Sequence, residues 1–102
     1  MSKYNVLIIE DDQHIAASLS EMLEILDHKV VGVAPSYEDA IEKLKDNDVE
    51  IALVDIQLKS EKTGIDVAEK LKSEFKLPFI FTTAYADKET IQKAAEHSPY
   101  GY

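Results

Sequence analysis

Short apolar runs alternate along this chain with stretches in which apolar residues recur at helical spacing. The apolar runs cover residues 4–9, 30–34, 51–54 and 79–81, and each has the length of a strand. Since the runs are almost wholly apolar, we expect helices to cover both faces of the sheet that they form.

The first two intervening stretches predict amphipathic helices. Ser36 with Asp39 three residues later is a capping box, and it opens a helix over the apolar positions Ala40, Ile41 and Leu44. In residues 13–27 the apolar side chains that share one helical face are Ile15, Leu19, Met22, Leu23 and Leu26.

Two more helices are predicted further along. The stripe that follows Gly64 and is ended by Pro78 consists of Ile65, Ala68, Leu71 and Phe75. Asp87 is expected to cap a fourth helix that buries Ile91, Ala94 and Ala95. Strands that alternate with single helices indicate parallel βαβ units with right-handed crossovers. The chain is therefore predicted to be one doubly wound α/β domain, because 102 residues leave no room for a second core.

The composition of the chain argues against several classes of function. The formal charge is −9, from 20 acidic and 11 basic residues, and this argues against direct nucleic-acid binding by this segment. The chain has no cysteine, which excludes disulfides and thiolate chemistry. No apolar run approaches the ~18 residues of a membrane span, and no signal peptide precedes the first strand. We therefore expect a cytoplasmic protein without membrane contact.

Acidic residues follow two of the predicted strands directly. Asp55 ends the run at 51–54, and the cluster Glu10-Asp11-Asp12 ends the first run. Parallel strands bring such residues together at the carboxyl edge of the sheet, where α/β folds place their chemistry. Gathered like charges are costly without a cation, and carboxylate oxygens suit Mg²⁺. The pattern predicts an anionic pocket for a hard metal ion beside a reactive aspartate.

The loop after the first strand excludes other phosphate-handling folds. It contains no glycine, so neither the dinucleotide fingerprint nor a P-loop can form there. After the fourth strand, Thr82-Thr83-Ala84 places small hydroxyl residues at the same sheet edge.

These features together resemble the receiver domain of two-component response regulators, from Tyr4 to Tyr102. The matching motifs are I-I-E-D-D at 8–12, L-V-D-I-Q-L at 53–58, Gly64, and F-T-T-A at 81–84. The resemblance implies a flavodoxin-like fold over residues 1–102 with strand order 2-1-3-4-5. It also implies a signalling module, and not an enzyme beyond its own phosphorylation and autodephosphorylation.

The resemblance assigns roles to individual residues. By this resemblance, Asp55 is expected to accept a phosphoryl group from a sensor histidine kinase or a phosphotransfer protein. The implied ligands for Mg²⁺, or Mn²⁺, are Glu10, Asp11, Asp55 and the backbone carbonyl of Gln57. Thr83 is implied as the switch hydroxyl and Tyr102 as the switch aromatic, which together would switch an output or a partner. Asp12 is interpreted as a helix cap and not as a ligand.

Two other functions stay open at this point. A pseudo-receiver would bind partners without phosphotransfer. A phosphatase of the haloacid-dehalogenase type also forms an aspartyl phosphate, but it needs D-x-D after the first strand, where this chain reads E-D-D-Q-H.

The family pattern continues beyond Tyr102 with a lysine on strand 5 and a fifth helix. We therefore expect a receiver domain that is truncated within strand 5 and lacks helix 5. Such a piece would leave the run at 79–81 as an apolar edge. We expect it to be unstable alone, or to form a homodimer or strand-swapped dimer through the strand 4/strand 5 edge. Size-exclusion chromatography and thermal melts check this, and a stable monomer at high concentration would count against it.

Overall fold

The computed structural model describes residues 4–56, 58 and 62–82. Strands and helices alternate along these residues as the sequence predicts. In chain order they are β1 (Asn5–Ile9), α1 (Gln13–Ile25), β2 (Lys29–Ala34), α2 (Tyr37–Asp46), β3 (Ile51–Asp55), α3 (Gly64–Lys70), the π-helical turn η1 (Leu71–Phe75) and β4 (Phe79–Thr82).

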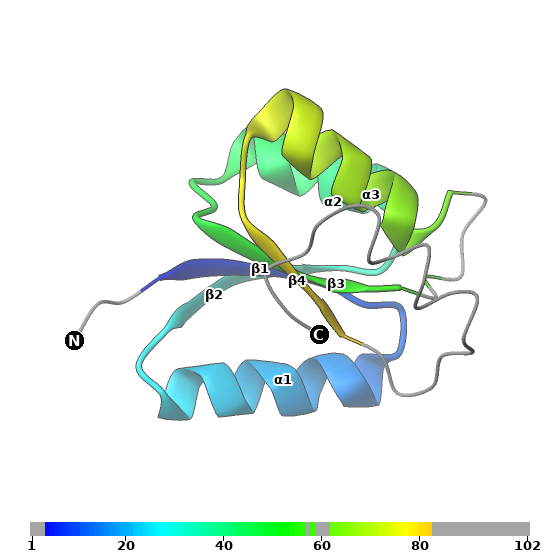
Figure 1. The fold of residues 1–102 in the computed structure, drawn as a ribbon. Coiled ribbons are helices and arrows are strands. Elements are labelled where there is room, and N and C mark those ends of the chain that lie inside the picture. The colour runs from blue at the N-terminus through cyan, green and yellow to red at the C-terminus, as the bar shows by residue number, and fades with distance from the viewer. Residues whose placement is uncertain (1–3, 57, 59–61, 83–102) are drawn as a thin grey trace.

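All described strands are parallel and stand in the order β2-β1-β3-β4. Helix α1 lies on one face of this sheet, and α2 and α3 lie on the other (Figure 1). This arrangement confirms the predicted doubly wound α/β fold and the first four positions of its strand order. The predicted fifth strand and the helix after Asp87 lie outside the described residues.

Side-chain caps begin both α1 and α2. The Asp12 carboxylate accepts the N–H groups of His14 at 2.9 Å and Ile15 at 3.2 Å, which starts α1. The Ser36 hydroxyl accepts the N–H of Asp39 at 3.2 Å and starts α2. Both caps agree with the sequence prediction.

The main core fills the space between the sheet and the α2–α3 layer. Phe79 and Phe81 of β4 pack edge to face with ring centroids 5.3 Å apart. They meet Val67, Ala68 and Leu71 in one cluster of buried residues. The stripe predicted after Gly64 therefore faces the core through its central positions, while Ile65 and Phe75 are partly buried at its margin.

The stripe predicted for α1 is only partly a core face. Ala16 is buried, but Met22 and Leu26 are 56% and 52% exposed. The apolar stripe is thus wider than the part of it that is buried among the described residues. The helix also ends at Ile25, and Asp27 turns the chain with a positive φ of 67°.

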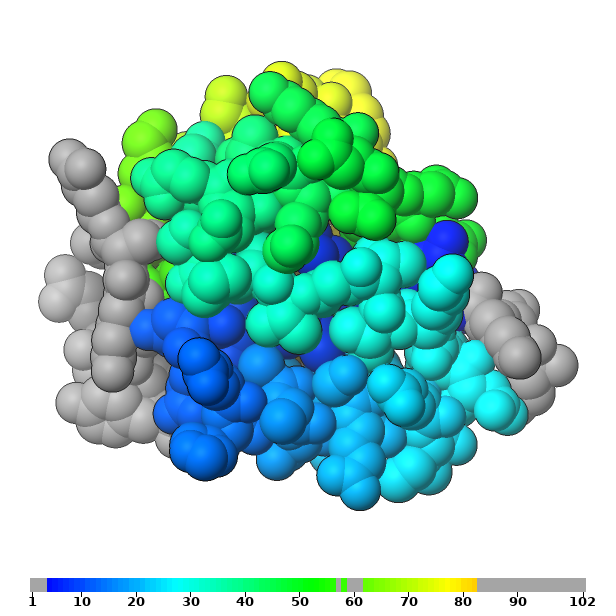
Figure 2. Space-filling model, turned by 180° about the vertical axis from the view of Figure 1, so that it is seen from behind, coloured from blue at the N-terminus to red at the C-terminus, as the bar shows by residue number. Residues whose placement is uncertain are grey.

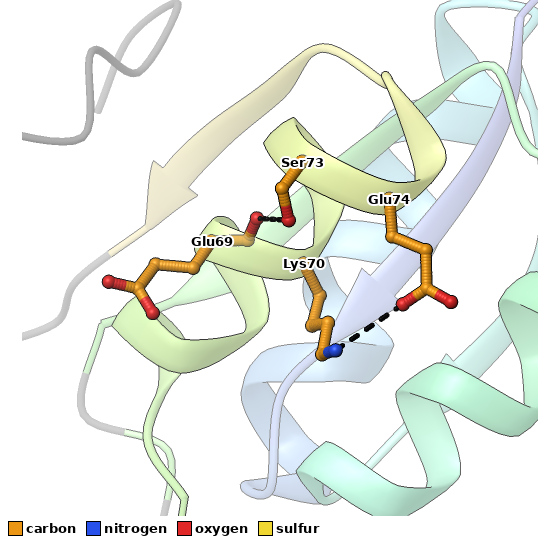
Figure 3. A network of polar contacts seen from close by, with 4 residues as sticks. All are labelled: Glu69, Lys70, Ser73 and Glu74. Carbon is orange, nitrogen blue, oxygen red and sulfur yellow. Dashed lines mark hydrogen bonds and ion pairs between the residues drawn. The ribbon is translucent and has the colours of Figure 1, made fainter.

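Helix α3 runs into η1, which ends at Phe75, the last position of the predicted stripe. The Ser73 hydroxyl donates to the Glu69 carbonyl at 2.7 Å, and Lys70 pairs with Glu74 at 3.5 Å (Figure 3). The turn closes at Phe75 because Lys76 adopts a left-handed conformation with φ 54°.

The two outer strands of the described sheet, β2 and β4, differ in how far their side chains are buried. β2 lies at the surface between α1 and α2 (Figure 2). In β4, Phe79 and Phe81 were expected at an open edge but lie in the core, so pairing through this strand would rely on its backbone. The dimer stays a prediction.

None of the described helices is long and apolar enough to cross a membrane.

Replacing Phe81 with alanine tests the core. Its ring is fully buried, so we expect Phe81→Ala to lower the free energy of unfolding by about 3–5 kcal/mol. Ile25→Ala is the control, because Ile25 is 75% exposed on α1 and such surface changes stay within about 0.5 kcal/mol. Urea denaturation measures both. Equal losses in the two variants would contradict this core assignment.

Candidate functional site: a carboxylate cluster at the sheet edge

Three carboxylates meet where β1 and β3 end. The two strands are parallel neighbours, and Ile9 pairs with Val54, so the residues that follow emerge at the same edge. Glu10, Asp11 and Asp55 each offer an oxygen, and these oxygens lie within 4.8 Å of one another. Glu10 and Asp55 are only 5% and 8% exposed, whereas Asp11 is half-buried. The cluster is thus largely withdrawn from water.

The backbone beneath the cluster is held from both sides. The Glu10 N–H donates to the Ala34 carbonyl of β2 at 2.9 Å, and the Ile56 N–H donates to the Thr82 carbonyl of β4 at 3.2 Å. Asp55 itself is paired with Thr82 in the ladder between β3 and β4. The carboxylates therefore project from fixed strand ends.

The electrostatics of the cluster are unfavourable for three bare carboxylates. Burial raises the pKa of Glu10 from 4.5 to about 8, aided by a hydrogen bond to Asp55 and by the charge of that residue. The Asp12 N–H donates to Glu10 Oε2 at 3.2 Å and partly opposes this shift. A bound cation would remove the need for a proton at this place.

The donor set fits a hard divalent cation. All three side chains offer carboxylate oxygens, which are the ligands that Mg²⁺ and Mn²⁺ prefer over nitrogen or sulfur. Glu10 and Asp11 directly follow β1, and Asp55 is the last residue of β3. The ligands are thus fixed relative to one another by the sheet.

The structure brings together the acidic residues that the sequence singled out. Glu10, Asp11 and Asp55 meet as expected, although their roles as ligands and phosphoacceptor stay predictions. Asp12 caps α1, as expected. Gln57, Thr83 and Tyr102 lie outside the described residues. Thr82, which precedes the proposed switch hydroxyl, pairs with Asp55.

Sequence reasoning missed one feature of the cluster. It treated Glu10 as a ligand and Asp12 as a cap, but not the hydrogen bond from the Asp12 N–H to the Glu10 carboxylate. An acid two positions before a helix cap is a weak signal, because the bond depends on how the loop turns.

Comparisons with known proteins agree with the fold. The model of the family "Response regulator receiver domain" matches residues 6–102. The phyllosphere-induced regulator PhyR of Methylorubrum extorquens is 37% identical over 84 residues, which are 81% of this chain and 32% of that regulator. This chain thus spans about a third of the length of that relative.

Solved structures show the same likeness. The signal receiver domain of a modulated diguanylate cyclase from Desulfovibrio desulfuricans is 40% identical with a TM-score of 0.91, covering 99% of this chain and 80% of that one. A CheY-like receiver domain protein from Methanospirillum hungatei is 26% identical with a TM-score of 0.82 and the same coverage.

The chain belongs to the response regulator receiver domain family. Its fold is the flavodoxin-like fold of CheY-like receivers, as the resemblance implied. Receiver domains are signalling modules of two-component systems, and they typically bind Mg²⁺ through acidic residues such as this cluster.

The raised pKa of Glu10 makes the stability of the metal-free protein depend on pH. The pKa of Glu10 is about 8 in the folded state, against an ordinary value of 4.5. Between pH 4.5 and 8 the folded state therefore binds more protons than the unfolded state, so the stability falls as the pH rises through this window. One pKa unit corresponds to about 1.4 kcal/mol. Glu10→Gln should therefore remove a fall of more than about 1 kcal/mol, as measured by urea denaturation in a chelator from pH 5 to 8.5.

Glu42→Gln is the matched control, because Glu42 is exposed on α2 and the charge change is the same. It should leave the pH dependence of the wild-type protein unchanged. A Glu10→Gln variant that loses stability across this window as steeply as the wild type would contradict the assignment.

Proposed function

We propose that this chain is a phosphoacceptor module that takes a phosphoryl group onto Asp55 with the help of a divalent cation. The observation that carries the proposal is the meeting of Glu10, Asp11 and Asp55 within 4.8 Å at the carboxyl edge of the sheet. Membership of the receiver family supports the same reading. A charged surface patch would not need two of its three acids to be buried.

Asp55 is the nucleophile in this proposal. One oxygen of its carboxylate attacks the phosphorus of a phosphohistidine, the P–N bond breaks, and its electron pair stays on the imidazole nitrogen. The product is an acyl phosphate, which water later hydrolyses. Glu10 and Asp11 would hold Mg²⁺ together with Asp55. When bound, this ion neutralises charge on the phosphoryl oxygens.

The place of Asp55 in the fold suits this role. Asp55 pairs with Thr82 of β4, and the preceding residue, Val54, pairs with Ile9 of β1, so the carboxylate is presented at a constant position. The negative charge of the acidic cluster repels an incoming phosphoryl group unless a cation is bound. Phosphorylation without a divalent ion is therefore disfavoured by the chain's own charges.

The donor and the readout follow from the family. We propose a sensor histidine kinase or a phosphotransfer protein in the cytoplasm as the donor, with Thr83 and Tyr102 as the switch pair that reports the phosphoryl group to an output or partner. The proposed chemistry is limited to gaining and losing this group, so the chain is not proposed to turn over a separate substrate.

Mass spectrometry of the intact chain tests the proposal. We expect incubation with Mg²⁺ and acetyl phosphate to add one phosphoryl group to the wild type and none to Asp55→Asn, because the amide is not a nucleophile for this reaction. Asp48→Asn is the control, because Asp48 is an exposed acid with the same charge change, and it should be labelled like the wild type.

Two outcomes would contradict the proposal. An adduct that persists in Asp55→Asn would place the acceptor elsewhere. Continuous consumption of acetyl phosphate that does not depend on Asp55 would favour a phosphatase instead.

A further inference from the structure

Gly64, the first residue of α3, lies directly against the backbone of Asp55. A Cβ atom added at Gly64 would overlap the carbonyl oxygen of Asp55 and lie 2.8 Å from its carbonyl carbon and 3.1 Å from the Cα of Ile56. These neighbours are backbone atoms and not flexible side chains. No glycine among the described residues has a positive φ, so this glycine serves close approach and not an unusual backbone conformation.

Neither partner in this contact can easily move away. On one side, Ala68 and Leu71 are fully buried and pack α3 and η1 against the core. The Thr63 N–H donates to the Asp66 carboxylate at 2.8 Å and fixes the start of the helix.

On the other side, the Asp55–Ile56 peptide is the last part of β3 that the sheet still holds. The Ile56 N–H donates to the Thr82 carbonyl at 3.2 Å, and the Ile56 side chain is buried. A displacement at this end of β3 moves the Asp55 carboxyl group, whereas Glu10 and Asp11 stay with β1.

We propose that Gly64 is a positioning residue for the phosphoacceptor: its missing side chain lets α3 support the peptide of Asp55 and so sets the distance between the Asp55 carboxylate and those of Glu10 and Asp11. This inference rests on the proposed function. Mg²⁺ demands near-ideal octahedral geometry, and phosphoryl transfer depends on alignment. A small displacement of Asp55 should therefore affect both metal binding and the chemical step.

Two other positions on the chain supply matched controls. The atoms nearest to an added Cβ at Gly32 belong to side chains: Lys43 Cδ at 3.2 Å and a methyl of Leu7 at 3.7 Å. Gly32→Ala is thus the same chemical change with room to relax. Val67→Ala loosens the packing of α3 without placing an atom against Asp55.

The experiment compares Gly64→Ala, Gly32→Ala and Val67→Ala with the wild type in two assays. Isothermal titration calorimetry gives the Kd for Mg²⁺, and intact mass gives the rate of phosphorylation by acetyl phosphate at saturating Mg²⁺. For Gly64→Ala we expect the Kd to rise and the rate to fall, each by at least about tenfold. Gly32→Ala should match the wild type, and Val67→Ala should lower the melting temperature while it keeps the wild-type Kd.

The outcomes separate this inference from the proposed function. A folded Gly64→Ala variant with the Kd and rate of the wild type overturns the inference, as does a Val67→Ala variant that loses Mg²⁺ affinity equally. A wild-type chain that gains no phosphoryl group on Asp55 overturns the proposed function instead.

A measurement on the wild type decides the matter if Gly64→Ala does not fold. The chain has three glycines, whose amide signals stand apart in nitrogen–proton NMR spectra. On titration with Mg²⁺ the Gly64 amide should shift with the same Kd as the Asp55 amide, while the Gly32 amide stays in place. A Gly64 amide that does not respond overturns the inference.

Discussion

The parallel pairing of β1 with β3 is the constraint on which the candidate site depends. Because Ile9 stands opposite Val54, the residues that follow these strands leave the sheet side by side, and Glu10 and Asp11 meet Asp55. The fold thereby holds three carboxylates together with two of them buried. The cost of this arrangement is visible in the raised pKa of Glu10, and a divalent cation offsets the same cost. The sheet thus holds the three carboxylates in an arrangement that suits a cation.

The second determinant is the packing of α3 beneath β3. Asp55 lies on a central strand, held through its ladder to β1 and β4, and Gly64 closes the space next to its peptide. The sheet fixes the carboxyl group laterally, and the helix fixes it from one face. Such support on several sides suits chemistry in which small errors of alignment are costly. It also connects the position of α3 with the geometry of the cluster.

Much of this could be predicted from the sequence, for physical reasons that differ between elements. The strands can be predicted because their apolar runs are short and continuous. The cluster can be predicted because Glu10 and Asp55 follow those runs directly. Helical spacing identified the apolar stripe of α1 but not how much of it is buried, and Met22 and Leu26 are exposed. The π-helical turn after α3, where the Ser73 hydroxyl donates to the Glu69 carbonyl, has no sequence signal of its own. The contact of Gly64 with Asp55 depends on how closely two separate segments approach. The roles of Gln57, Thr83 and Tyr102 rest on resemblance alone.

Paramagnetic broadening by Mn²⁺ tests most directly whether the carboxylates form one cation site. The chain has 20 acidic residues, so scattered surface binding is the real alternative. At substoichiometric Mn²⁺ we expect the amide signals of Glu10, Asp11 and Asp55 to broaden first and together, and excess Mg²⁺ to restore them. Broadening that begins at exposed acids such as Glu42 and Asp48, and leaves Asp55 sharp, would contradict the account.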